Sequence, residues 1–173
     1  MTGIVYKSTG SWYTVKSEEG GFVDCRIKGK FRMKGIKSTN PIAVGDVVDF
    51  ELDTNSDAIT GSISNIHERK NYIVRKSVNL SHQMHIIASN LDYVFLLVTV
   101  NNPPTTFNFI DRFLVTAEAY GIETILVFNK IDTIDVEKMA YLREKFSDLS
   151  PIFISAAVGE GLEDLKLKIA ASL

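Results

Sequence analysis

Cysteine is nearly absent: Cys25 is the single cysteine among 173 residues. An internal disulfide is therefore excluded, which fits a reducing compartment. No apolar run approaches the roughly 18 residues of a membrane-spanning helix, and the N-terminus lacks a signal-peptide pattern. The three histidines have no cysteine or carboxylate neighbours at metal-ligand spacing, so no metal site is predicted in this chain. We expect a cytoplasmic protein with no membrane contact.

A strong excess of either charge is also absent, since the net charge is −2. The two halves differ, however. Residues 1–90 carry 12 basic and 9 acidic side chains, whereas residues 91–173 carry 7 and 12. A basic front half and an acidic rear half indicate two units with different partners.

The front half has the pattern of short strands separated by turn residues. β-Branched and aromatic residues concentrate in five segments, 3–8, 11–17, 22–28, 46–52 and 59–66. This pattern predicts a five-stranded barrel of the oligonucleotide/oligosaccharide-binding (OB) type over residues 1–75. Cys25 is expected to be a small buried residue of that barrel. A polar, basic linker is expected over residues 76–90.

In the rear half, residues 91–173, the hydrophobic pattern changes to continuous apolar runs that alternate with segments of helical spacing. Residues 93–100, 124–128 and 151–155 are apolar runs typical of strands buried on both faces. Asn108 and Asp135 are placed to cap helices and Gly121 to end one. The order β-α-β-α-β-α predicts a partial parallel sheet with crossover helices. The residues expected to face inward from the helices are Ile110, Phe113, Leu114, Ala117, Val136, Met139, Ala140, Phe146, Leu162, Leu165, Ile169 and Leu173.

The second apolar run ends in Asn129-Lys130-Ile131-Asp132, at the edge where open α/β sheets bind ligands. An ionised Asp132 can accept hydrogen bonds from N1–H and the 2-amino group of guanine, whereas adenine would leave it unpaired. Lys130 can lay its methylene stem along the base, and Asn129 can bond the base edge and tie loops together. A simple Asn/Asp turn is the alternative explanation.

The third run ends in Ser155-Ala156-Ala157, where small residues would let backbone N–H groups reach guanine O6. Two loops suited to guanine at neighbouring strand ends favour a guanine site over a simple turn. Another kind of nucleotide-binding α/β domain is disfavoured, because no glycine-rich turn follows residues 93–100.

A phosphate-binding loop is missing. GxxxxGK followed by Ser or Thr occurs nowhere, and the nearest approximation, residues 34–39, has Ile36 between glycine and lysine. No DxxG segment is present to face a metal ion on the phosphates, so no catalytic residue is predicted in this chain. Because the residues before 91 have a barrel pattern, the loop is expected after residue 173. That order requires a circularly permuted, P-loop GTPase-like α/β domain.

With this order of motifs the sequence resembles the ribosome small-subunit biogenesis GTPases of the RsgA (YjeQ) type. The resemblance implies guanine recognition by Asn129, Lys130, Asp132 and Ser155–Ala157. It also implies GTP hydrolysis, GTP and GDP as ligands, and association of a monomeric full-length protein with the small ribosomal subunit and its RNA. Mg²⁺ and a structural Zn²⁺ are expected only in the full-length family protein. The segments that carry the resemblance are 25–32, 41–50, 66–77, 86–100, 107–132 and 154–165.

The resemblance further predicts that this chain is an N-terminal fragment that ends before the phosphate loop and does not hydrolyse GTP by itself. The alternative is an RNA-binding OB module attached to a non-catalytic α/β scaffold. A phosphate loop within roughly 20 residues after Leu173 would favour the enzyme over the module.

Basic residues cluster in two stretches that lack carboxylates, from Cys25 to Gly45 and from Arg69 to Leu91. OB barrels hold nucleic acid with basic grooves and aromatic platforms, and the resemblance implies ribosomal RNA as the ligand. Of the nearby aromatics, we expect Trp12, Tyr13, Phe22 and Phe31 to lie in the barrel core. The predicted RNA contacts are Arg26, Lys28, Lys30, Arg32, Lys34, Lys37, Arg75 and Lys76.

Overall fold

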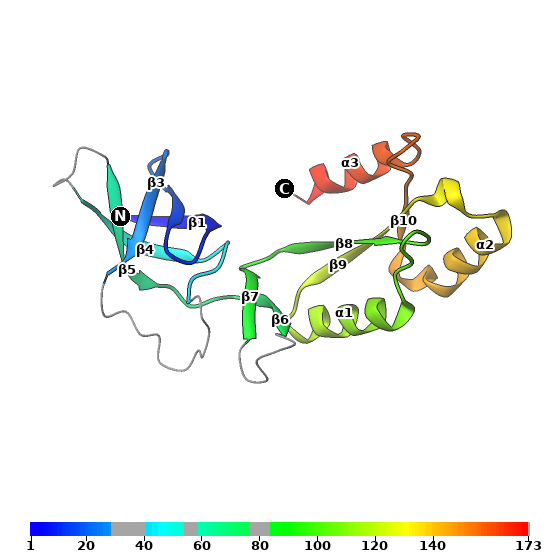
Figure 1. The fold of residues 1–173 in the computed structure, drawn as a ribbon, viewed down its shortest axis with the longest axis horizontal. Coiled ribbons are helices and arrows are strands. Elements are labelled where there is room, and N and C mark those ends of the chain that lie inside the picture. The colour runs from blue at the N-terminus through cyan, green and yellow to red at the C-terminus, as the bar shows by residue number, and fades with distance from the viewer. Residues whose placement is uncertain (29–40, 54–58, 77–83, 173) are drawn as a thin grey trace. The chain divides into compact units, whose positions relative to one another are not determined.

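The computed structural model describes residues 1–28, 41–53, 59–76 and 84–172 (Figure 1). The chain divides into two compact units, Met1–Leu91 and Asp92–Leu173. None of the helices in the described part of the chain is long and apolar enough to cross a membrane.

Five strands of the first unit form a closed barrel, as predicted. They are β1 (Thr2–Ser8), β2 (Tyr13–Ser17), β3 (Phe22–Ile27), β4 (Val47–Asp53) and β5 (Thr60–Ile66). Their order around the barrel is β1-β2-β3-β5-β4, and β3 and β5 are the parallel pair. Alternate residues point inward, as the two-residue period of a strand requires. The buried core consists of Val5, Tyr13, Val15, Cys25, Ile42, Val48, Phe50 and Ile63.

Cys25 is fully buried, which confirms its predicted place. Burial, with a smaller contribution from the charge of Asp24, raises the pKa of the Cys25 thiol to about 11. A Cβ on Gly61 would lie 2.6 Å from the Cys25 sulfur, so the neighbouring strand needs a glycine there.

A two-stranded hairpin, β6 (Tyr72–Lys76) and β7 (Met84–Ser89), completes the first unit. The segment predicted as linker, 76–90, therefore contains a strand. The hairpin is joined to the barrel through Asp46, a fully buried carboxylate. Arg69 donates to both of its oxygens at 2.6 Å, and the Ser89 hydroxyl donates to Oδ1 at 2.5 Å. A buried charge is tolerated here because it is paired and hydrogen-bonded on several sides.

The second unit contains a three-stranded parallel sheet. β8 (Tyr93–Thr99), β9 (Glu123–Asn129) and β10 (Ile152–Phe153) lie in the order β10-β9-β8, which confirms the predicted parallel pairing. Helices α1 (Phe107–Ala119) and α2 (Val136–Lys145) pack on the face that carries Leu126 and Phe128. Helix α3 (Leu162–Ala171) packs by Leu162 and Leu165 on the opposite face, against Ile125 and Val127.

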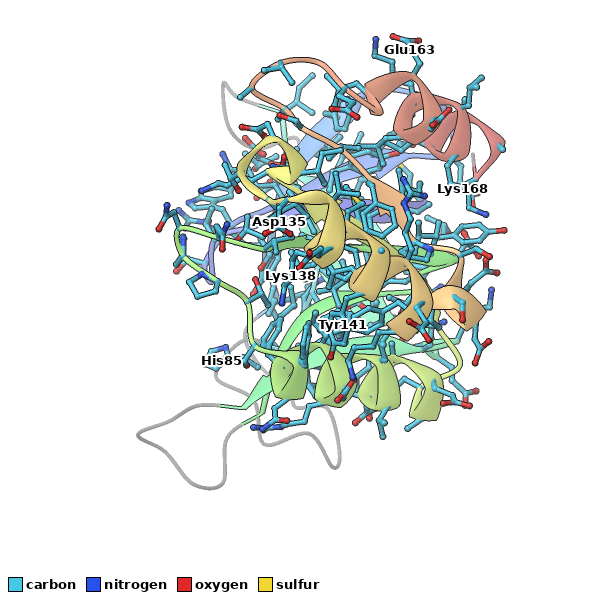
Figure 2. The ribbon with its side chains drawn as sticks, turned by 90° about the vertical axis from the view of Figure 1, so that its right-hand side faces the viewer. His85, Asp135, Lys138, Tyr141, Glu163 and Lys168 are labelled. Carbon is cyan, nitrogen blue, oxygen red and sulfur yellow. The ribbon has the colours of Figure 1, made fainter. Side chains whose placement is uncertain are left out.

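The helix ends agree with two of three predictions. Asp135 caps α2 by accepting a hydrogen bond from the Lys138 N–H at 2.7 Å; Figure 2 shows Asp135 at the start of α2 with Lys138 and Tyr141 beyond it. Gly121, with φ +66°, ends α1 in a Schellman arrangement, since Ile122 N–H bonds the Ala117 carbonyl. The prediction that Asn108 caps α1 was wrong.

The cap of α1 is Thr106, whose hydroxyl accepts from the Phe109 N–H, so the helix begins one residue before Asn108. The inward face of α2 also differs from the prediction. Phe146 is buried as predicted and Leu142 is buried beside it, whereas Val136 is 86% exposed and Ala140 is exposed. In α3, Ile169 is 41% exposed, and Leu173 lies outside the described residues.

Candidate nucleotide-base site

The site is built from two loops that follow neighbouring parallel strands. Val127 pairs with Ile152 and Phe128 with Phe153, so β9 and β10 end side by side. Asn129 is the last residue of β9, and a short 3₁₀ helix, Ile131–Thr133, follows Lys130. The loop after β10 contains Ser155, Ala156 and Ala157. The structure thus brings together the six residues that the sequence predicts at one sheet edge.

Asn129 connects the two loops. Its Oδ1 accepts hydrogen bonds from the Lys130 N–H at 2.7 Å and from the Ala156 N–H at 3.1 Å. Within the described part of the chain, the Asn129 amide nitrogen has no hydrogen-bond partner. The side chain therefore fixes the loops with its acceptor and keeps its two donors for a ligand.

Asp132 is held by Ser155. The Ser155 residue is completely buried, and its hydroxyl donates to Asp132 Oδ1 at 2.5 Å. The Ser155 oxygen also accepts the Val158 N–H at 3.4 Å. Asp132 itself is exposed, and its Oδ2 has no partner among the described residues. A carboxylate oriented from behind by a buried hydroxyl presents its other oxygen to solvent or to a ligand.

Lys130 adopts a left-handed backbone conformation, with φ +65°. This conformation is unusual for a residue with a side chain and is often found at functional sites. Its ammonium group donates to the carbonyl of Asn102, in the loop between β8 and α1. The Asn101 side chain in the same loop donates to the Thr133 carbonyl at 3.0 Å.

Asn101, Asn102 and Thr133 were not among the predicted site residues. Their signal in the sequence is two consecutive polar residues directly after the apolar run 93–100, at the carboxyl end of a predicted strand. In the structure they attach a third loop to the base site.

A tight turn shapes the second loop. Ser155 N–H donates to the Glu160 carbonyl at 2.9 Å, and Gly159 N–H returns to the Ser155 carbonyl at 2.9 Å. Gly161 has φ +70°, and a Cβ there would lie 2.1 Å from the Phe153 carbonyl oxygen. Only glycine fits this position, so the turn depends on Gly161.

Ala156 and Ala157 are exposed at the tip of this turn. The Ala156 N–H already donates to Asn129, so it reaches a base oxygen only if it shares or exchanges that bond. The Ala157 N–H has no partner within the described residues. Contact of both alanines with guanine O6 therefore stays a prediction, and Ala157 is the donor that is not already engaged.

The predicted RNA-contacting residues of the front half are only partly described. Arg26 is exposed and stacks over the Trp12 ring, with its guanidinium carbon 3.8 Å from the ring centroid. Lys28 is exposed and forms a 3.3 Å ion pair with Glu51. Such a surface pair is worth little, so Lys28 stays available to a stronger partner. Outside the described residues lie Lys30, Arg32, Lys34 and Lys37, and also the side chains of Arg75 and Lys76.

The aromatic residues of the barrel do not all lie in its core. Tyr13 is buried as expected, and Trp12 is half-buried beneath Arg26. Phe22 is 61% exposed, so its predicted place in the core was wrong. The reason is strand register: Phe22 pairs with Lys16, whose side chain points outward. Phe31 lies outside the described residues.

No group of three or more His, Cys, Asp or Glu side chains within the described ranges could hold a metal ion. The polar groups described at the sheet edge are hydrogen-bond donors and acceptors of Asn129, Lys130, Asp132 and the loop after β10.

A closed barrel followed by a parallel sheet with polar loops at its carboxyl edge has counterparts among circularly permuted GTPases. YjeQ from Thermotoga maritima matches with a TM-score of 0.71 at 35% identity, over 96% of this chain and 56% of that chain. YloQ, described as a circularly permuted GTPase, matches with a TM-score of 0.61 over 89% of this chain and 50% of that chain. At 24% identity, YloQ shows the fold alone. The class is therefore the circularly permuted GTPase fold.

The chain belongs to the RsgA family. The family model described as RsgA GTPase matches residues 66–173, and the one described as RsgA N-terminal domain matches residues 2–60. The small ribosomal subunit biogenesis GTPase RsgA of Flavobacterium psychrophilum is 71% identical over 171 residues, which is 96% of this chain and 52% of that protein. The protein of the same name from Bacteroides fragilis is 50% identical, over 96% of this chain and 54% of that protein. The chain spans about half the length of the curated relatives it matches.

Proposed function

We propose that this chain supplies the guanine-recognition half and the RNA-contacting barrel of a GTPase that acts in late assembly of the small ribosomal subunit. The observation that carries the proposal is the pair of hydrogen bonds Asn129–Ala156 and Asp132–Ser155, which joins two loops at the carboxyl edge of the sheet. The family relatives, named small ribosomal subunit biogenesis GTPases, support the biological setting. GTP and GDP are the proposed ligands, and the cytoplasm is the proposed location.

Discrimination between bases rests on Asp132. Guanine offers N1–H and a 2-amino group side by side, and a fixed carboxylate accepts both. Adenine offers neither donor in that place, so its binding would desolvate the carboxylate without compensation. Ser155 restricts the carboxylate to one orientation before the base arrives, which lowers the entropy cost of binding.

The remaining residues complete the pocket for the base. The methylene stem of Lys130, anchored through its ammonium group at Asn102, covers one face of the ring. The free donors of Asn129 face acceptors on the other edge of the base, and the Ala157 N–H is the candidate donor to O6. No residue of this chain is assigned a catalytic role.

Hydrolysis by the isolated 173-residue chain is not expected. The sequence contains neither GxxxxGK with Ser or Thr nor DxxG, so phosphate contacts and a Mg²⁺ site are not supplied by these residues. Loss of about three or four charge-assisted contacts lowers affinity by roughly a thousandfold or more. The isolated chain therefore binds guanosine and GDP with similar, weak affinity.

Titration of the purified chain with guanosine, GDP and adenosine, followed by amide chemical shifts, tests the base site. We expect shifts at residues 129–132 and 155–157 with guanosine and GDP, and none with adenosine. Equal shifts with adenosine would overturn guanine recognition. Phosphate release from GTP above the background rate would contradict the proposed inactivity.

RNA contact by the barrel is tested separately through its salt dependence. Lysine and arginine side chains that bind phosphates release the counterions condensed on the RNA. The affinity for RNA therefore falls steeply as the salt concentration rises. We expect the parent chain to bind RNA. Replacement of Lys30, Arg32 and Lys34 by alanine should weaken this binding and make it less dependent on salt than that of the parent. Guanosine shifts without any RNA binding would leave the base site in place and remove the barrel's proposed partner, the small-subunit RNA.

A further inference from the structure

The outer surface of strands β1, β2 and β3 carries aromatic rings that the barrel core does not use. Tyr6 is 51% exposed and Phe22 is 61% exposed. The two rings meet edge to face, with centroids 5.4 Å apart and an interplanar angle of 81°. The Lys16 ammonium lies 5.5 Å from the Tyr6 ring centroid, and Lys16 pairs directly with Phe22 across the strands.

A second ring lies on the same surface. Trp12 precedes β2 and carries the Arg26 guanidinium stacked on it at 3.8 Å. Lys16 lies four positions after Trp12, or about 13 Å along the strand. We call the five residues Tyr6, Trp12, Lys16, Phe22 and Arg26 the aromatic face.

The charges between the two ring clusters favour an anion. Thr14 and Asp24 pair across the strands there, and the Thr14 hydroxyl donates to Asp24 at 2.7 Å. Asp24 keeps its negative charge in this hydrogen bond, so it offsets one of the two cations Lys16 and Arg26. Lys7, exposed on β1 beside Thr14, adds a third cation. The carboxylates of Glu18 and Glu19 lie in the turn beyond the strands.

Rings in water with cations beside them are the elements from which sequence-tolerant single-strand binding sites are built. Exposed aromatic rings that lie together, as Tyr6 and Phe22 do, are typical of surfaces that contact a partner. We propose that the aromatic face binds unpaired bases of RNA. Bases stack on the Tyr6–Phe22 pair and on the Trp12–Arg26 stack, while Lys7 and Lys16 contact phosphates. This proposal rests on the RNA contact proposed above for the barrel.

The geometry distinguishes unpaired bases from a duplex. In an RNA helix the base faces are stacked on one another, and only phosphates, sugars and base edges are accessible. The exposed rings cannot stack on the bases of such a helix, which offers only its phosphate charge to the neighbouring cations. The aromatic face therefore predicts preference for single strands, which cationic side chains alone do not provide.

The sole tryptophan of the chain, Trp12, allows a direct test by fluorescence. The purified chain is titrated with a single-stranded oligouridylate and with an RNA duplex of the same length, at one fixed salt concentration. We expect quenching and tighter binding with the single strand. Phe22→Leu and Tyr6→Leu each weaken single-strand binding by about fivefold to a hundredfold and leave its salt dependence unchanged.

Phe109→Leu on α1 is the matched control, because this ring is 52% exposed but belongs to the other unit. It is expected to leave RNA binding unchanged. Since Phe22 and Tyr6 are both exposed, their variants keep the barrel fold, which Cys25 protection against thiol reagents verifies.

Three results would overturn the proposal that the aromatic face binds unpaired bases. In the first, both leucine variants bind the single strand as tightly as the parent; in the second, the duplex binds equally well. In either case the barrel remains an RNA-contacting unit. In the third, the variants change the oligomeric state in sedimentation and not RNA binding, which makes the rings a protein contact. Absence of RNA binding by the parent chain at low salt is a distinct outcome and removes the proposed RNA function itself.

Discussion

Asp132 accepts a 2.5 Å hydrogen bond from Ser155 on Oδ1, and each of its two oxygens still has a lone pair for a ligand. An asparagine in its place offers one acceptor and one donor instead of two acceptors. Such an amide pairs with the N1–H and C2 carbonyl of xanthine, whereas the guanine 2-amino group meets another donor. We expect Asp132→Asn to lose guanosine-induced amide shifts and to gain shifts with xanthosine. Asp135→Asn, three residues on, keeps a good helix cap and should leave base preference unchanged.

We expect Ser155 to act on the base through Asp132, to which its hydroxyl donates. Ser155→Ala removes a hydrogen bond to a charged group, which is worth about 1.5–3 kcal/mol when fully realised. We expect guanosine affinity to fall about tenfold in chemical-shift titrations. Urea unfolding of the two proteins separates this effect from general loosening of the loop. An unchanged guanosine affinity in Ser155→Ala would show that Ser155 does not act through Asp132.

Asp49, on the barrel, predicts a pH dependence of stability. Its oxygens accept from Asn65 at 2.9 Å and lie 2.9 Å from the His67 ring nitrogen. The hydrogen bonds from Asn65 and His67, with that from Thr2, lower the pKa of Asp49 from 3.8 to about 2. Because the pKa is lower in the folded state, the stabilisation is complete above about pH 4 and is lost as pH falls toward 2. Because the Asp49 and His67 side chains are exposed to solvent, this contribution to the free energy of unfolding is small.

Urea unfolding midpoints between about pH 5 and pH 2, compared for the parent and Asn65→Ala, check this pH dependence. The variant should lose less stability on acidification, because less of its folded-state pKa shift remains. Parallel acid profiles for the two proteins would show that Asp49 does not contribute.

Among the secondary-structure elements, α1 shows where sequence reasoning was sufficient and where it was not. Gly121 was correctly predicted to end the helix, because a left-handed C′ position has one preferred residue type. The start was misplaced, because Thr106 and Asn108 are both good caps and only tertiary placement decides between them.

A matched pair of substitutions tests the cap of α1. Thr106→Ala should lower the free energy of unfolding of the second unit by about 1 kcal/mol, since the Phe109 N–H loses its side-chain acceptor. Asn108→Ala should change it by less than about 0.5 kcal/mol, because the residue is exposed and lies within the helix. Chemical denaturation measures both. A larger loss for Asn108→Ala would restore the sequence-based assignment.

Strand register explains the other errors. The expectation that Tyr13 lies in the core was correct, but a strand's two-residue period cannot say which residue of β3 lies beside Lys16. That register depends on the turn between the strands, and it put Phe22 outside. The contacts of Asp46 with Arg69, and of Asn101 with Thr133, join residues far apart in the chain. Local sequence patterns carry no information on such pairs.

For the molecule as a whole, the two units are built on unequal cores. The barrel closes its sheet, so its backbone hydrogen bonds are protected on every side. The second unit has an open three-stranded sheet, and within the described residues β8 pairs with β9 alone. Helix α3 has no fully buried residue. An open edge and a thin outer layer allow opening at lower free energy, or association through the edge.

We therefore expect amide protons of β8, β9 and α3 to exchange faster than those of β1–β5. Cys25 provides an independent probe: its buried thiol, with its raised pKa, reacts with thiol reagents only when the barrel opens. Its labelling should follow the slow exchange of the barrel and not the faster exchange of the second unit. Sedimentation at several concentrations shows whether the sheet edge self-associates. Equal protection of both units in a monomeric sample would mean that the open sheet is as stable as the closed barrel, contrary to this prediction.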